Sequence, residues 1–252
     1  MKNFLIFIVM STWSVFSCAR AVDELVFVGQ DYPPYHWQDK NKARGLFPEV
    51  IQTTCQKIKV KCRFKIEPFK RGLMEIESGQ NDAMMGLIHN TEREKFAKFT
   101  APLASSAKSY FGMKTKVGEL KNIKDLDGAT VAVVRESSSS KLAHQHKNQL
   151  SSLKIVEQSD NATILRMIFA GRFGRQAYIL GNRDVIFHLI KKDGYESITE
   201  LLFVEDEEYS IAFSKKKVPD ALFEKFNTAL TALKHSKSIK GIYQKYGLSV
   251  AS

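Results

Sequence analysis

Leu126–Val134 (LDGATVAVV) decides how this chain of 252 residues is organised. Asp127 and Gly128 mark a turn, and Thr130–Val134 is a short apolar run typical of a strand that is buried on both faces. An earlier run of the same kind, Leu25–Gly29, opens a first series of strands and helices. The same pattern therefore starts again near residue 126. We predict two α/β units rather than one continuous sheet.

Helices and strands alternate on both sides of this point. The predicted strands and helices are 25–29, 48–58, 61–66, 71–79, 82–88, 110–114, 130–134, 141–149, 155–156, 161–170, 177–180, 183–191, 209–214, 219–235 and 238–246. Alternation of this kind indicates parallel sheets with helices on both faces.

The N-terminus has the pattern of a signal peptide. Lys2 precedes an apolar run that ends near Phe16, and Ala19-Arg20-Ala21 gives the small-x-small pattern before a cleavage site. A membrane span needs ~20 apolar residues, more than this run supplies. We expect residues 1–21 to be removed on export to the periplasm. Two other interpretations are a buried N-terminal helix and a lipid anchor on Cys18, although Phe16 is bulky for a lipoprotein site.

Two cysteines remain after residues 1–21, namely Cys55 and Cys62. In an oxidising compartment such a pair favours a disulfide, here between the end of a helix and the start of the next strand. The pair has no nearby histidine, so we expect no metal site there.

The charge is strongly basic, with a formal net value of +11. Two of the basic residues, Lys2 and Arg20, lie in the signal, which has no acidic residue, so +9 remains. The other basic residues are dispersed, and the runs Lys191–Lys192 and Lys215–Lys217 contain no aromatic residue. We interpret the charge as a solvated basic surface and predict no nucleic-acid partner.

Short motifs follow one another in a characteristic order over nearly all of residues 23–248. They are Gly29-x-Asp31-x-Pro33-Pro34-Tyr35-x-Trp37, Arg44-Gly45-Leu46, Pro68-x-x-Arg71, Gly79-x-x-Asp82-Ala83, Thr91-Glu92-Arg93, Phe99-Thr100-Ala101-Pro102, Asp125-Leu126-x-Gly128-x-x-Val131-x-Val133, Ser137-Ser138, Tyr209-Ser210-Ile211-Ala212-Phe213-Ser214-Lys215 and Ile242-Tyr243-x-Lys245-Tyr246. In this order the chain resembles the polar-amino-acid-binding group of periplasmic solute-binding proteins.

The resemblance implies the type II periplasmic-binding-protein fold, in which two α/β lobes are joined by two crossing strands. The crossings would lie near Tyr110–Met113 and Tyr209–Phe213. Lobe one would then comprise residues 22–110 and 212–252, and lobe two residues 111–211. A small polar ligand would bind between the lobes, without cofactor or metal. The implied partner is an ABC-transporter permease. We expect the protein to be a monomer that contacts the membrane only through this permease.

Arg93 matches the family arginine that grips the ligand's α-carboxylate. A guanidinium suits this role because its planar fork donates two parallel, charge-assisted hydrogen bonds. The end of the preceding strand, with Gly86 and Leu87, would bring backbone groups beside the carboxylate. Ser137 and Ser138 stand where a helix begins, and hydroxyls and free N–H groups there form an anion cradle.

The remaining candidates shape the cleft. Tyr32 and Phe69 match family positions that sandwich the ligand side chain. Trp37 is either a cleft wall or loop packing. Arg71 is either a second anion contact or a salt bridge to the loop near Asp31.

One departure from the family concerns the acidic residue that receives the ligand's ammonium group. The turn before it reads Gly171-Arg172-Phe173-Gly174, with Gly174 in place of the usual aspartate. Asp184 could serve if the loop is displaced, and Asn182 only weakly. Because an unpaired cation in a closed cleft is costly, the sequence leaves open a carboxylate ligand without an ammonium group.

Three functions follow from these observations. The first is ligand capture for an importer, without catalysis. The second is an enzyme on the same scaffold, resembling cyclohexadienyl dehydratase, for which Glu136, His89 or Asp31 would be the general acid. The third is a sensing module that presents its ligand to a receptor.

Overall fold

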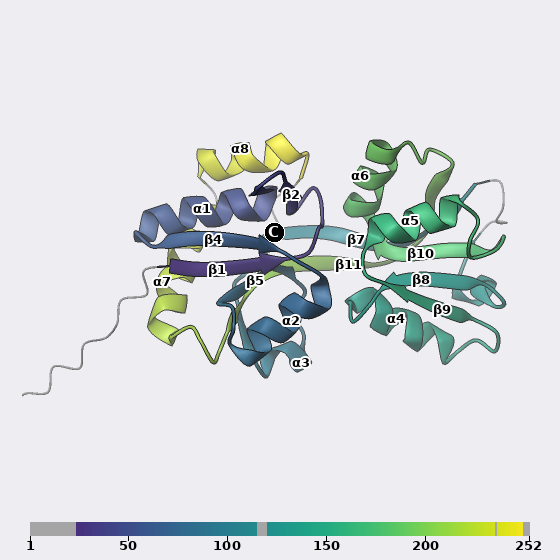
Figure 1. The fold of residues 1–252 in the computed structure, drawn as a ribbon, viewed down its shortest axis with the longest axis horizontal. Helices are drawn as coiled ribbons and strands as arrows, with labels where there is room; N and C mark the ends of the chain where they lie inside the picture. The colour runs from purple at the N-terminus through teal and green to yellow at the C-terminus, as the bar shows by residue number, and fades with distance from the viewer. Residues whose placement is uncertain (1–23, 115–119, 235, 249–252) are drawn as a thin grey trace, which may run out of the picture.

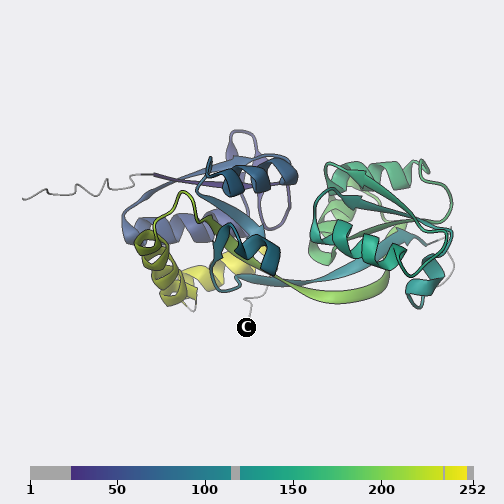
Figure 2. The same cartoon turned by 90° about the horizontal axis from the view of Figure 1, so that it is seen from below.

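The protein has two lobes connected by two long strands (Figure 1; Figure 2). The computed structural model describes residues 24–114, 120–234 and 236–248. The signal peptide predicted at residues 1–21 and the lipid-anchor alternative at Cys18 lie outside these ranges. Within them, no helix has both the length and the apolar character needed to cross a bilayer.

Lobe one is built on parallel strands. Its elements are β1 (Glu24–Gly29), β2 (Trp37–Asp39), β3 (Lys42–Arg44), α1 (Leu46–Ile58), β4 (Lys61–Ile66), α2 (Phe69–Ser78), β5 (Ala83–Leu87), α3 (Thr91–Glu94), β6 (Ala97–Phe99), α7 (Asp220–Lys234) and α8 (Lys237–Tyr246). Strand β1 pairs in parallel with β4 on one side and with β5 on the other. Helices α7 and α8 return the end of the chain to α1.

Lobe two repeats the design. Its elements are η1 (Ile123–Leu126), β8 (Thr130–Val134), α4 (Ser138–Lys147), β9 (Lys154–Gln158), α5 (Asn161–Phe169), β10 (Ala177–Asn182) and α6 (Arg183–Asp193). Strand β8 lies between β9 and β10, parallel to both. Its alternate side chains enter different core clusters: Val131 and Val133 face one way, and Ala132 and Val134 the other. This burial on both faces explains the continuous apolar run in the sequence.

The lobes are joined by the antiparallel strands β7 (Ala104–Met113) and β11 (Ile198–Ser214). The joining segment lies earlier in β7 than Tyr110–Met113, because Lys108–Gly112 already pair with β10 of lobe two. At the other end, Ser210–Phe213 pair with β5 and β6 of lobe one. The crossing is therefore Ala104–Ala107 opposite Asp206–Tyr209. No turn marks this boundary, and the crossings that the resemblance implies, near Tyr110–Met113 and Tyr209–Phe213, lie a few residues further along each strand.

A disulfide between Cys55 and Cys62 staples α1 to β4, with the two Cα atoms 6.3 Å apart. This separation lies within the range that a disulfide can span. The expected staple between a helix end and the following strand is confirmed.

Candidate functional site

Arg93 is held in place by the short helix α3. The side chain of Asn90 caps this helix and accepts a hydrogen bond from the Arg93 backbone N–H at 2.9 Å. Because α3 follows the end of β5, Arg93 lies beside the strand end. Its Nη1 atom donates to the carbonyl of Ile88 at 2.7 Å, and its guanidinium lies 5.7 Å from the centre of the Phe69 ring.

Arg93 is a buried cation, with 4 % of its surface exposed. Burial lowers the pKa of Arg93 to about 10, while Glu207 and Tyr209 act in the opposite direction. The group therefore remains protonated at neutral pH. A guanidinium has five N–H donors, and the bond to Ile88 is the one that this side chain makes to the described residues. The other donors are available to an anion.

A small cavity of about 40 Å³ lies between the lobes at this point. Its lining comes from both lobes and from β11, and most of the residues have polar side chains. The lining residues are Gln30, Tyr32, Phe69, Gly86, Leu87, Ile88, Arg93, Val134, Ser137, Ser138, Ser139, Asn161, Gly181, Asn182 and Tyr209. Among these, Arg93 is the one side chain that carries a charge at neutral pH.

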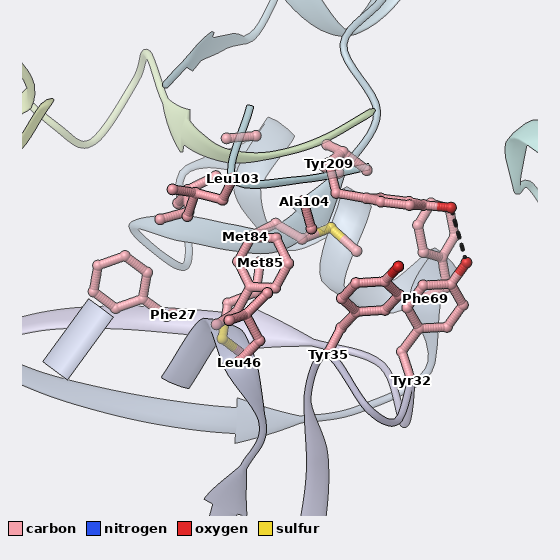
Figure 3. Packing of buried hydrophobic residues seen from close by; sticks show 14 of the residues in the cluster. Phe27, Tyr32, Tyr35, Leu46, Phe69, Met84, Met85, Leu103, Ala104 and Tyr209 are labelled. Carbon is pink, nitrogen blue, oxygen red and sulfur yellow. Dashed lines mark hydrogen bonds between the residues drawn. The ribbon is translucent and has the colours of Figure 1, made fainter. Parts of the chain in front are cut away.

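The wall from lobe one is aromatic and closely packed. Figure 3 shows Tyr32, Phe69 and Tyr209 together, with the hydroxyls of Tyr32 and Tyr209 joined by a hydrogen bond of 3.2 Å. Gly86 has a φ of +63°, and a Cβ atom on it would lie 2.7 Å from Cε1 of the buried His36. A glycine is required there because any side chain would collide with the imidazole ring.

The wall from lobe two is the beginning of α4. Ser137 caps the helix: its Oγ accepts from the Ser140 N–H at 3.1 Å and donates to the Val134 carbonyl at 2.6 Å. Its hydroxyl proton is therefore already used. The N–H groups of Ser138 and Ser139 lie in the first turn, where the helix offers no acceptor. Together with the helix dipole, these backbone groups favour an anion at the cavity.

Three predicted residues do not line the cavity. The Arg71 side chain is 68 % exposed and pairs with Glu75 at 2.8 Å and with Glu67 at 3.3 Å on its own side of the lobe. Trp37 packs edge-on against Tyr246, with ring centres 5.8 Å apart. Asp184 accepts a hydrogen bond of 2.7 Å from the Tyr35 hydroxyl and thereby joins the two lobes.

The end of β10 presents an amide instead of the family aspartate. Asn182 lines the cavity, but its Nδ2 donates to the Tyr209 hydroxyl at 2.8 Å and its Oδ1 accepts from the Val185 N–H at 3.0 Å. Both ends of the amide are therefore occupied. Gly174 lies in an open loop with a φ of +87° and no atom within 4 Å of an added Cβ.

The sequence pattern did not single out Tyr209, Gln30 or Asn161 as ligand-facing residues. Tyr209 is buried in the hinge strand β11. Its burial is the main cause that raises the pKa of Tyr209 well above its usual value, and the nearby negative charge of Glu207 raises it further. It is therefore a neutral hydroxyl. Glu207 and Tyr209 are two positions apart, and strand alternation would have placed them on one face. The register of β11 on β7, which turns this face toward the cavity, was not evident from the sequence.

None of the three residues considered as a general acid lines the cavity. Glu136 pairs with Lys70 at 3.3 Å, and His89 pairs with Glu94 at 2.7 Å. Asp31 is exposed at the surface. The cavity thus offers a cation, backbone amides and neutral hydroxyls, a combination suited to holding a ligand.

Known proteins share both the sequence pattern and the fold. The family model of the bacterial extracellular solute-binding proteins, family 3, matches residues 25–249. The "probable amino-acid-binding protein YxeM" of Bacillus subtilis (strain 168) is 27% identical over 91% of this chain and 86% of its own length.

Solved structures superpose closely. A histidine kinase sensor domain with similarity to periplasmic binding proteins matches with a TM-score of 0.80 and 21% identity, over 91% of this chain and 97% of that one. An ancestral arginine-binding protein bound to arginine also matches with a TM-score of 0.80, at 22% identity over 89% of this chain and 98% of that one. The family match covers most of the chain, and the two-lobed α/β fold agrees with it. The chain belongs to the bacterial extracellular solute-binding proteins, family 3.

Proposed function

We propose that this protein captures a small carboxylate-bearing ligand between its lobes in the periplasm and delivers it to an ABC importer. The ligand is an amino acid or a related anion. The membership in a family of extracellular solute-binding proteins supports the class of function. Relatives described as amino-acid-binding and a structural neighbour described as bound to arginine support the class of ligand.

The observation that carries the proposal is the position of Arg93. A buried guanidinium with unused donors is costly unless an anion pairs with it. The first-turn amides of α4 face it from the other lobe, and both donor sets line one cavity. A carboxylate placed between them would bond to both lobes at once. Such a ligand stabilises the closed arrangement because it binds that arrangement more tightly than an open one.

Closure has a structural basis in the two strands of the hinge. An amino acid needs more room than about 40 Å³, so entry requires the lobes to separate about β7 and β11. Contacts across the gap favour the closed form. They include the Tyr35–Asp184 hydrogen bond and the exposed ion pair between Lys70 and Glu136.

The decisive experiment is a binding screen on the mature protein. Thermal shift and titration calorimetry are run with the standard amino acids, dicarboxylates and other small carboxylates. Arg93→Ala is expected to weaken binding of the best ligand by about a hundredfold or more, which corresponds to the ~3 kcal/mol of a charge-assisted bidentate pair. Arg93→Lys should retain part of the affinity.

Arg71→Ala is the matched control, because it removes the same chemical group from a position outside the cavity. We expect its affinity to stay within threefold of the unmodified protein. Equal losses in the two alanine variants, or no loss in Arg93→Ala, would contradict the proposal.

A further inference from the structure

The ligand cavity contains a cation but no carboxylate of its own. Among the described residues that line it, Arg93 carries the one charge, and the end of β10 contributes Gly181 and Asn182 instead of an acid. A buried carboxylate behind the lining comes from the hinge. Glu207 of β11 is 5 % exposed and contacts two residues that do line the cavity, Ser138 and Tyr209.

Glu207 belongs to a charged cluster on one face of β11. Glu205, Glu207 and Tyr209 alternate along the strand and share that face. Lys108 of β7, which is 2 % exposed, lies between the carboxylates, with Nζ–O distances of 2.8 Å to Glu205 and 2.9 Å to Glu207. Two carboxylates share a single ammonium group, so this cluster keeps a net negative charge directly behind the cavity.

The direction of each hydrogen bond follows from counting protons. A carboxylate only accepts, so Tyr209 donates its one proton to Glu207. The Tyr209 oxygen then accepts from Asn182 Nδ2 at 2.8 Å and from the Tyr32 hydroxyl at 3.2 Å. Tyr32 has therefore also used its proton. The same holds for Ser138, whose Oγ donates to Glu207 at 3.1 Å.

Two parts of the lining therefore differ chemically, while the side-chain amides of Gln30 and Asn161 can both donate and accept. Tyr32 and Ser138 keep only lone pairs for a ligand, because Glu207 draws both protons toward the hinge, directly or through Tyr209. Arg93 and the first-turn amides of α4 offer only donors. A ligand that matches both sides carries a carboxylate at one end and a cationic N–H donor close to it.

We propose that Glu207 is the negatively charged positioning residue of the site, and that Tyr32 and Ser138 accept the ammonium group of an amino-acid ligand in place of the missing aspartate. This inference rests on the proposed function and makes it narrower. Glu207, a carboxylate from the hinge, would take the role of the lobe-two aspartate that this sequence lacks. The ligand that lacks an ammonium group, left open by the sequence, becomes the weaker binder.

The test compares ligands that differ only in the ammonium group. The mature protein is titrated calorimetrically with each of the twenty standard L-amino acids and with the desamino analogue of each, in which hydrogen replaces the α-amino group. The best amino acid is expected to bind at least tenfold more tightly than its desamino analogue. In Glu207→Gln this preference should fall by about tenfold or more, because the amide keeps the shape but not the charge.

Glu208→Gln is the matched control. Glu208 is the next residue of the same strand, is exposed and faces the other way. In Glu208→Gln the preference for the amino acid over its desamino analogue should therefore stay within twofold of that of the unmodified protein. If Glu207→Gln does not fold, Tyr209→Phe tests the same series of hydrogen bonds, because it removes the hydroxyl that links Glu207 to Tyr32. It should lower the preference in the same direction.

The outcomes separate the two proposals. Equal binding of amino acids and desamino analogues by the unmodified protein, with both lost in Arg93→Ala, would overturn only the inference about Glu207. That inference also fails if a folded Glu207→Gln or Tyr209→Phe keeps the full preference. Binding that survives in Arg93→Ala, or no binding of either ligand class, would overturn the proposed function itself.

Discussion

The two lobes meet the cavity with different kinds of structure. Lobe one brings tightly packed aromatic rings: Tyr32 stacks on Tyr35, and His36 contacts Tyr32 and packs edge-on against Phe47. Lobe two brings the start of α4, where the groups facing the cavity are backbone amides and short polar side chains. Under the proposed function, lobe one would act as the packed platform for the ligand, and lobe two as the polar cover that completes the site.

Glycine substitutions should expose this difference most strongly. Gly86→Ala places a Cβ atom 2.7 Å from Cε1 of His36 at a φ of +63°. We expect a loss of about 3 kcal/mol in the free energy of unfolding, from backbone strain and overpacking together. Gly174→Ala in lobe two has a φ of +87° but no neighbour within 4 Å, so only the strain of ~1 kcal/mol applies.

Urea denaturation of the two variants measures both values. Similar losses would mean that the wall of lobe one gives way as easily as an open loop, and the packed-platform interpretation would have to be abandoned.

The disulfide should contribute the next largest effect. Replacing Cys55 and Cys62 with alanine removes the only disulfide formed by the described residues. For so short a loop the chain-entropy model gives ~2.5 kcal/mol. Native-state hydrogen exchange should show faster exchange in β1 and β4, while β8 and β9 in lobe two change little. Equal acceleration in both lobes would show that the two do not open independently.

The pH dependence of stability should also come mainly from lobe one. His36 is 1 % exposed, its Nδ1 has no partner among the described residues, and burial lowers the pKa of His36 to about 3. Because the unfolded chain binds a proton near pH 6.5 and the folded one does not, stability is full above 6.5 and falls as the pH drops toward 3. One pH unit corresponds to ~1.4 kcal/mol, so we expect a loss of about 2 kcal/mol between pH 6.5 and 5.

The comparison variant is His36→Leu, which should show a shallower slope of unfolding free energy against pH over this window. His146 of lobe two is the comparison: burial lowers its pKa as well, but its Nδ1 is hydrogen-bonded to the Tyr110 hydroxyl at 2.6 Å. An unchanged slope in His36→Leu, with a flattened one in His146→Gln, would reverse the expected order of the lobes.

Local patterns predicted most of the secondary structure. The strand at Lys61–Ile66 has the predicted bounds, and the helix predicted from Asn161 begins there. Strand β11 was predicted only from Tyr209 but begins at Ile198. The first part of this strand was not predicted because it contains the acidic run at residues 205–208. Charged residues are untypical of a strand unless partners such as Lys108 are present.

The candidate site was predicted unevenly for the same reason. Arg93, Tyr32, Phe69, Gly86, Leu87, Ser137 and Ser138 all line the cavity. Arg71 instead pairs with two glutamates on its own side of the lobe, and Asp184 accepts a hydrogen bond from a tyrosine of the other lobe. The choice among competing partners depends on distances that a linear motif does not contain.

The sequence by itself determined two α/β units and most of their elements, because hydrophobic periodicity and turn residues act over a few neighbouring positions. The order of its motifs indicated the resemblance to the family, and that resemblance singled out Arg93. Only the tertiary structure decided that β11 begins as early as Ile198 and in which register it pairs with β7, which brings Glu207 next to Ser138 from a distant part of the chain. Strand partners and register result from the packing of whole elements, and the electrostatic character of the cavity follows from that packing.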